Sequence, residues 1–200
     1  MKKWLVTGLG NPEGKYFGTW HNLGFVAAER LAEELGIEFK KKGNMLLGDK
    51  DKVFIQKPLT YMNRSGEAVL ALKRKHGLNA GNIIVLVDDL YIDKGKIKIV
   101  RGGTSGHNGP RNIKELLGND EYIRIKIGIK PAKEMADMAN YVLSRIPEAQ
   151  RQIISEALEN TVAAVKLLVS GESLELIQTK FNTRSCGHIK RSEDTAREND

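Results

Sequence analysis

A continuous run of apolar residues, Ile83 to Val87, constrains the fold of this chain more than any other stretch. Strands buried on both faces of a parallel sheet show such uninterrupted runs, whereas half-exposed strands alternate. The run ends at two carboxylates, Asp88 and Asp89. An earlier apolar run, Trp4 to Val6, leads through a glycine-rich loop into a helical pattern that starts near Leu23. The chain is therefore predicted to be an α/β protein with a buried, mostly parallel sheet.

Other periodicities predict the remaining elements. A polar turn between two apolar runs indicates a hairpin over 45–55, and alternating isoleucines indicate a strand over 122–129 with a core face and a wet or polar-covered face. Helical spacing that stops at a glycine is typical of a helix C-terminus. On this basis helices are expected to end at Gly36, Gly77, Gly118 and Gly171, with further helices near 135–142 and 174–177.

The length of 200 residues fits one domain, which we place at 1–182, followed by a polar tail at 183–200 that is expected to be disordered. No apolar run approaches the ~20 residues needed to span a bilayer, so a cytoplasmic protein without a membrane partner is expected. A single cysteine, Cys186, excludes an internal disulfide and a multi-thiolate metal site.

The net charge of +7 is compatible with a polyanionic partner. Aromatic residues make up only 6% of the chain and no RNP-type motif is present, so contacts to phosphates are favoured over base stacking on a sheet.

Several common catalytic motifs are missing. Gly8-x-Gly10 follows a strand, but Glu13 occupies the third glycine position of a dinucleotide fingerprint. There is no Gly-Lys-Ser/Thr phosphate loop, and the elbow pattern around Ser105 fails because His107 holds the fifth position. The histidines also lack a His-x-x-x-His metal spacing. A hydrolase of this sequence would activate water.

His21 is the candidate base for that water, because it follows the loop after the first strand and has a suitable ordinary pKa. Asp88, at the end of a neighbouring strand, could hold its second nitrogen. Asn11, Asn63 and Asn108 lie in loops expected at the same edge of the sheet, where amides can bind water, peptide groups or an oxyanion. The alternatives are local: His21 could bond within its turn, and Asn63 or Ser65 could cap the next helix.

Five stretches resemble the successive motifs of bacterial-type peptidyl-tRNA hydrolases, in order and approximate spacing, between about Leu5 and Asn182. They are GLGNPEGKYFGTWHNLGF, KPLTYMNRSGEAV, VDDLYIDKGKI, GGTSGHNGPRNI and YIRIKIGIKP.

The resemblance implies roles for residues of these stretches. His21 corresponds to the catalytic base and Asp88 to its partner, while Asn11 and Asn63 correspond to catalytic amides. The residues implied in substrate binding are Tyr16, Met62, Asn63 and Asn108.

The resemblance also implies a single domain with a twisted mixed sheet between helices, and hydrolysis of the ester between peptide and tRNA without metal or cofactor. A monomer without an obligate protein partner is implied, with a basic surface that holds the acceptor arm and a segment near 135–141 that covers the cleft. Arg101 and Lys126 are the nearest candidates for gripping tRNA phosphates.

Three positions depart from the family pattern. Trp20 replaces the usual arginine, Glu13 precedes the usual glycine, and Tyr91 replaces an aspartate. Two other functions stay open: a non-catalytic RNA-binding protein, which would not need His21 with Asp88, and an esterase for small substrates, which would not need a basic surface.

Overall fold

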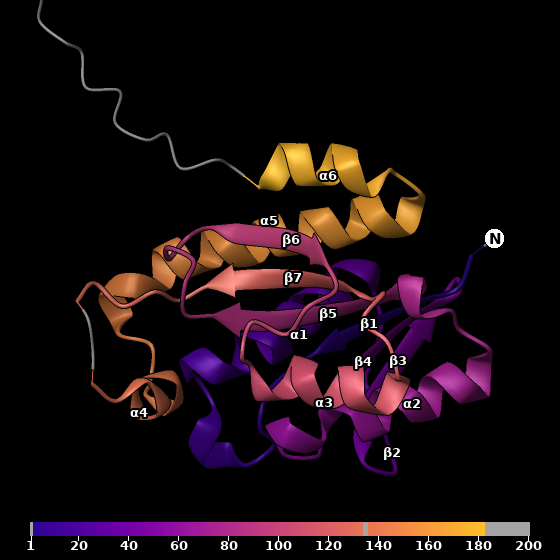
Figure 1. Cartoon of the computed structure of the whole chain (residues 1–200), viewed down its shortest axis with the longest axis horizontal. Coiled ribbons are helices and arrows are strands. Elements are labelled where there is room, and N and C mark those ends of the chain that lie inside the picture. Colours follow the sequence, from indigo (N-terminus) through magenta and orange to yellow (C-terminus); the bar gives the residue numbers. More distant parts are fainter. Residues whose placement is uncertain (1, 134–135, 183–200) are drawn as a thin grey trace, which may run out of the picture.

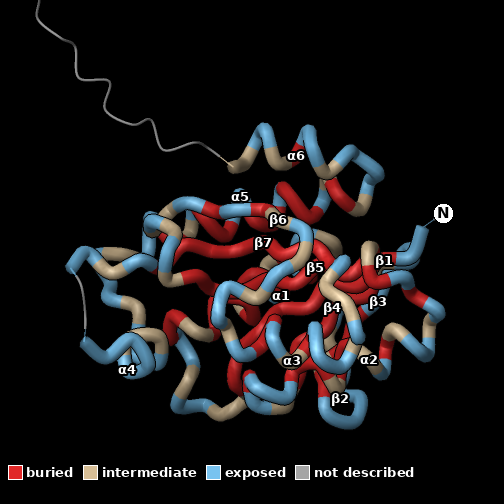
Figure 2. The backbone as a smooth tube through the Cα atoms, viewed as in Figure 1, coloured by how far each residue is buried: buried red, intermediate tan, exposed pale blue. Residues whose placement is uncertain are grey.

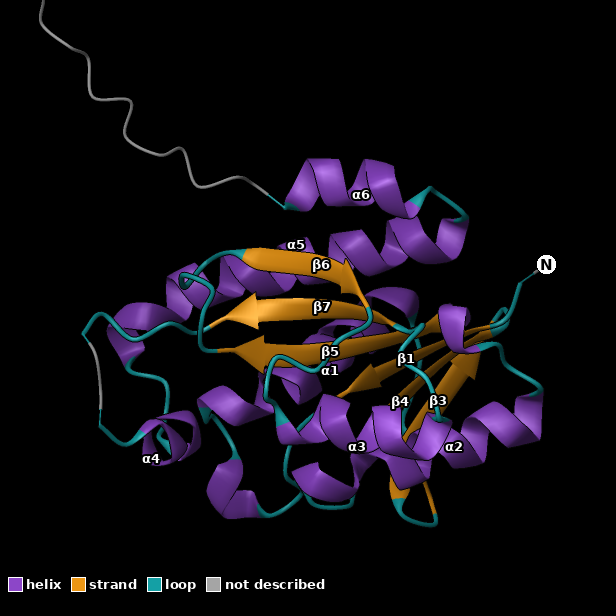
Figure 3. Cartoon of the chain, in the orientation of Figure 1, coloured by secondary structure: helices purple, strands orange, loops and turns teal. Residues whose placement is uncertain are grey.

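The computed structural model describes residues 2–133 and 136–182, which form a three-layer α/β domain (Figures 1 and 3). A seven-stranded sheet lies between two layers of helices, which is the layer arrangement that the resemblance implied. The expected tail at 183–200, with Cys186, lies outside the described residues.

The sheet is mixed, with the strand order β2-β3-β4-β1-β5-β7-β6. The four central strands are parallel, and antiparallel pairs flank them on both sides. An extended segment was expected to begin at residues 37–39, and the strand β2 follows directly after it, over three lysines that carry no apolar alternation. The strands are β1 (Trp4–Gly8), β2 (Lys40–Lys42), β3 (Met45–Lys50), β4 (Val53–Pro58), β5 (Ile83–Asp89), β6 (Ile97–Arg101) and β7 (Ile123–Gly128).

Four helices end, as predicted, where a glycine takes a left-handed conformation, which an L side chain rarely adopts. The α-helices are α1 (Leu23–Leu35), α2 (Ser65–His76), α3 (Asn108–Leu117), α4 (Met138–Leu143), α5 (Arg151–Ser170) and α6 (Leu174–Phe181). Short 3₁₀ turns lead into three of them: η2 (Trp20–Asn22) into α1, η3 (Met62–Arg64) into α2 and η5 (Glu148–Gln150) into α5. The 3₁₀ turns η1 (Gly14–Tyr16) and η4 (Ala80–Asn82) lie in the loop after β1 and directly before β5, respectively.

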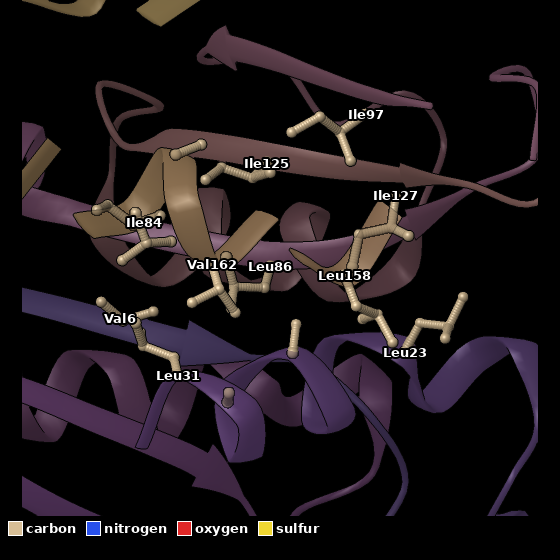
Figure 4. Close-up of a cluster of buried hydrophobic side chains, with 14 of the residues drawn as sticks. Val6, Leu23, Leu31, Ile84, Leu86, Ile97, Ile125, Ile127, Leu158 and Val162 are labelled. Carbon is tan, nitrogen blue, oxygen red and sulfur yellow. The ribbon is translucent and has the colours of Figure 1, made fainter. Parts of the chain in front are cut away.

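Each face of the sheet packs against its own helices, so the red, buried part of the tube follows the central strands (Figure 2). On one face, α1 and α5 contribute Leu31, Leu158 and Val162 against the isoleucines of β5 and β7 (Figure 4). On the other face, α2 and α3 contribute Val69 and Ile113. Because both faces are covered, β5 is buried along its whole length, as its apolar run predicted.

The two edges of the sheet are closed differently. On β2, Lys40–Lys42 are exposed along the outer edge. On β6, the amide of Asn182 accepts from the Ile99 N–H at 2.6 Å and donates to the Ile99 carbonyl at 2.8 Å, and Gln178 donates to the same carbonyl. A side chain thus takes the place of a neighbouring strand there.

No helix among the described residues combines the length and apolar character that crossing a bilayer requires.

The strands that follow β1 in the chain, β2 to β4, lie on one side of the β1–β5 pair. The strands that follow β5, namely β6 and β7, lie on the other side. Where connections diverge in this way, a crevice opens at the carboxyl ends of the strands. The loop after β1 is held there by bonds from the Leu9 N–H to the Leu86 carbonyl and from the Phe25 N–H to the Leu9 carbonyl.

Gly24, in the first turn of α1, allows the helix to approach β1 and β5. A Cβ there would lie 2.3 Å from the Leu86 carbonyl oxygen and 2.5 Å from the Leu9 nitrogen. We expect Gly24→Ala to lower the free energy of unfolding by about 1–3 kcal/mol, as overpacking does, measured by urea denaturation. Gly14→Ala is the control, because within the described residues no atom beyond its chain neighbours lies within 4 Å of the added methyl group. Equal stability of the two variants would contradict this packing argument.

Candidate active site

A cleft of about 730 Å³ opens at the carboxyl ends of β1 and β5. Its walls come from the loop after β1, from η3, from the end of β5, from the start of α3 and from α4. Segments far apart in the sequence therefore meet in one space. The cleft is lined by Asn11, His21, Tyr61, Met62, Asn63, Asp88, Asp89, Leu90, Tyr91, Ser105, Gly106, His107, Asn108, Met138, Ala139, Val142 and Leu143.

His21 and Asp88 are in direct contact in this cleft. The Nδ1 atom of His21 lies 3.1 Å from both carboxylate oxygens of Asp88. A carboxylate only accepts, so Nδ1 carries the proton and the lone pair of Nε2 is left for another partner. The imidazole is thus held in the tautomer that a general base needs.

Two opposing effects act on His21. Burial disfavours its charged form, but the charge and hydrogen bond of Asp88 outweigh this, so the pKa of His21 lies above its ordinary value of 6.5. Burial would also raise the pKa of Asp88, yet the imidazoles of His21 and His107 hold it well below its usual range. Asp88 is therefore ionised throughout the range in which His21 titrates.

His107 is the site residue that the sequence reasoning missed. Its Nε2 lies 3.1 Å from Asp88 Oδ1, and its ring centroid lies 4.9 Å from that of His21. Its Nδ1 accepts from the Gly109 N–H in the first turn of α3, so Nε2 carries the proton and donates it to Asp88. The signal was present in the sequence, since His107 precedes Asn108, but spacing alone did not link it to Asp88.

The same cluster has the composition of a metal site. The ligand atoms of His21, Asp88 and His107 lie within 4.8 Å of one another. Ligation through Nε2 of His107 would require that atom to lose its proton, and a proton on Nδ1 would then face the Gly109 N–H. The hydrogen bonds present therefore fit an orienting role for His107 better than a metal ligand.

Asn11 is fixed by the loop that carries His21. The side chain of Asn22 accepts from the Asn11 N–H at 2.8 Å and donates to the Asn11 carbonyl at 3.0 Å. The Asn11 side-chain oxygen accepts from the Met62 N–H at 3.0 Å. Because that oxygen is used, the group that Asn11 offers to the cleft is its NH₂ donor.

Asn63 and Asn108 are exposed in the cleft wall. Asn63 does not cap α2: the N-cap position belongs to Arg64, and Ser65 donates its hydroxyl to the Met62 carbonyl. Both alternatives weighed for Asn63 and Ser65 are therefore wrong.

The other predicted substrate-binding residues are placed differently. Met62 lines the cleft, with 5% of its surface exposed. Tyr16 is part of η1, outside the cleft lining that the described residues form, so its role stays a prediction. Of the departures from the family pattern, Tyr91 stands at the cleft with 78% of its surface exposed.

Asp89 and Lys126 form a second buried pair beside the cleft. Lys126 Nζ lies 2.6 Å from Asp89 Oδ2 and donates to the Ser105 hydroxyl at 3.0 Å. Arg124 donates to the same hydroxyl and to the Gly102 carbonyl. The polar face of β7 is thus covered by polar partners, one of the two outcomes that its alternation allowed. Arg101 is exposed, whereas only 11% of the Lys126 side chain is exposed. The contact of each residue with tRNA phosphates stays a prediction.

Comparison with known proteins places the chain. The model of the family described as peptidyl-tRNA hydrolase matches residues 5–189. The chain belongs to the peptidyl-tRNA hydrolase family.

Individual relatives agree. A peptidyl-tRNA hydrolase of Clostridium acetobutylicum is 40% identical, with 89% of this chain and 97% of the relative covered. One of Bifidobacterium animalis subsp. lactis is 38% identical, with 90% and 98% covered. The crystal structure of the Acinetobacter baumannii peptidyl-tRNA hydrolase superposes with a TM-score of 0.83 at 30% identity, covering 90% of this chain and 95% of that one.

The pH dependence of this peptidyl-tRNA hydrolase family member tests the His21–Asp88 pair. If His21 acts as the general base, activity requires its neutral form and should fall as the pH drops through a pKa above 6.5. Asp88→Asn removes the negative charge that raises the pKa of His21 while burial still lowers it, so the acidic limb of kcat/KM should move to lower pH. The rate should also fall by about 10²–10⁴-fold, the usual contribution of general-base catalysis.

Asp93→Asn is the matched control, because it removes a carboxylate that is 53% exposed from the loop after β5. An acidic limb that stays in place in Asp88→Asn would refute the assigned pairing.

Proposed function

We propose that this protein hydrolyses the ester bond between a peptide and the 3′-terminal ribose of tRNA, and so releases peptide and tRNA during translation. The observation that carries the proposal is the imidazole of His21, fixed by Asp88 in a cleft lined by three asparagines, in a chain of this family.

The proposed reaction starts with a water molecule at His21 Nε2. The imidazole takes one proton, and the hydroxide adds to the ester carbonyl carbon. The resulting imidazolium is stabilised by Asp88 at 3.1 Å. When the tetrahedral intermediate collapses, the bond to the ribose oxygen breaks and the imidazolium returns the proton to that oxygen. Water is consumed, and a carboxylic acid and a ribose hydroxyl are formed.

Amide donors support the charges that develop in this reaction. The NH₂ group of Asn11 is held by the bond to Met62 and can position the water. Asn63, or a backbone N–H of the cleft loops, donates to the oxyanion, and Asn108 binds the peptide backbone. Donors that are fixed before the reaction stabilise a developing oxyanion without reorganisation.

The rest of the proposal concerns the partner and the setting. The net charge of +7 favours the polyanionic acceptor arm of tRNA, with Arg101 and Lys126 as candidate phosphate contacts. We propose a monomer that acts in the cytoplasm and needs no metal or other cofactor.

His21→Ala should reduce the release of peptide from purified peptidyl-tRNA by about 10²–10⁴-fold, while tRNA binding changes little, because the imidazole supplies proton transfer. The assay contains EDTA, and wild-type turnover should be unchanged by it. His76→Ala is the control, since His76 ends α2 and packs on Phe54 away from the cleft. Near-native turnover in His21→Ala would dismiss His21 as the base, and loss of wild-type turnover in EDTA would dismiss the metal-free mechanism.

Salt dependence tests the tRNA contacts. If Lys126 contacts a phosphate, one fewer counterion is released when tRNA binds to Lys126→Met. The slope of the logarithm of the tRNA association constant against the logarithm of salt concentration should then be smaller by about one unit. The pair Lys126→Met with Asp89→Asn separates this effect from the cost of leaving Asp89 unpaired. Arg101→Gln is examined in the same way, and Lys166→Gln, which removes a charge from α5, is the control. An unchanged slope removes the residue concerned from the tRNA footprint.

A further inference from the structure

Trp20 directly precedes His21 and is only 1% exposed. It connects the base loop, which we define as residues 9–22 between β1 and α1, to α4. Its ring stacks on Tyr141 of α4, with centroids 5.5 Å apart and planes at 26°. The ammonium of Lys94, from the loop after β5, lies 5.2 Å from the Trp20 ring and 5.8 Å from the Tyr141 ring. The stack therefore joins three segments around the cleft.

Backbone bonds reinforce this junction. The Trp20 N–H donates to the Ser144 carbonyl at 3.3 Å, and the Ile146 N–H donates to the Gly18 carbonyl at 2.8 Å. The Tyr141 hydroxyl donates to the Ile129 carbonyl at 2.7 Å, at the end of β7. Residues 141–146 are thus tied both to the base loop and to the sheet.

The helix α4 is short, and only Tyr141 and Val142 of its residues pack against the core. It has six residues, none of them buried, and isolated helices of this length are unstable in water. It nevertheless supplies one wall of the cleft through Met138, Ala139, Val142 and Leu143. That wall is apolar, whereas His21, Asn63 and Asn108 make the facing loops polar. The position of the apolar wall therefore depends on the packing of Val142 and on the contacts of Tyr141, which include the stack on Trp20.

We propose that Trp20 is a positioning residue, which holds α4 in place through Tyr141 and Lys94 so that the apolar wall binds the side chain of the residue esterified to tRNA. This proposal rests on the proposed function. Trp20 acts through α4 and does not touch the reacting atoms. Its effect should appear in the binding of substrates with apolar side chains and not in the chemical step.

The test compares two esters on the same tRNA, N-acetyl-leucyl and N-acetylglycyl. Trp20→Ala should raise KM for the leucyl ester about tenfold, because a stacked aromatic pair and a cation over it are lost. For the glycyl ester KM should change less, and kcat should stay close to wild type for both. Trp20→Phe keeps a ring on Tyr141 and should restore most of the leucyl KM.

Lys94→Gln tests the cation separately. It should raise the leucyl KM by a smaller factor than Trp20→Ala, about threefold. Lys96→Gln removes the same charge two residues away, where the ammonium pairs with Asp93, and should leave KM for both esters unchanged. If both lysine variants raise KM by the same factor, only the lost positive charge matters for tRNA binding, and the role given to Lys94 in the stack is refuted.

Hydrogen exchange supplies a readout that does not depend on activity. Amides of residues 138–143 should exchange faster in Trp20→Ala than in wild type, and at near-wild-type rates in Trp20→Phe. If the folded Trp20→Ala variant shows unchanged exchange there, or raises KM equally for both esters, or loses only kcat, the proposal is overturned. If wild type hydrolyses neither ester, the proposed function fails, while the exchange rates still test the hold on α4.

Discussion

The carboxylate of Asp88 is the group on which the arrangement of the site depends. It is 3% exposed at the end of a central strand, and a buried charge without partners would strongly destabilise the fold. Its partners come from two loops, His21 from the connection after β1 and His107 from the connection after β6. The contacts that stabilise this buried charge therefore also orient the His21 imidazole.

Asp88 and its neighbour Asp89 divide the polar contacts of the site between them. Asp88 contacts the imidazoles, and Asp89 contacts Lys126, which also bonds Ser105 in the glycine-rich loop before α3. Ser105 has a φ of 50°, a conformation that is uncommon outside glycine, and the bonds from Lys126 and Arg124 help to hold it there. The cations of β7 thus stabilise the loop that presents His107.

The sequence allowed much of this to be predicted, because its strongest patterns are local. Apolar runs placed β1 and β5, glycines marked the ends of four helices, and the loops after the strands pointed to His21 and Asp88. The missed features depend on contacts between segments that are distant in the sequence. His107 contacts Asp88 because β6 brings the loop before α3 to the cleft, and Trp20 contacts Tyr141, which lies more than half the chain length away. The periodicity of the sequence does not indicate such contacts.

The closed edges of the sheet bear on how the chain behaves at high concentration. Exposed backbone at an edge strand is a template on which another chain can add a strand. Here three lysines repel such an approach at β2, and the amides of α6 already occupy Ile99 on β6. A strand added at β2 would have to approach three positive charges, and a strand added at β6 would find the backbone of Ile99 already hydrogen-bonded. The fold therefore disfavours fibrous self-assembly through the edges of its sheet.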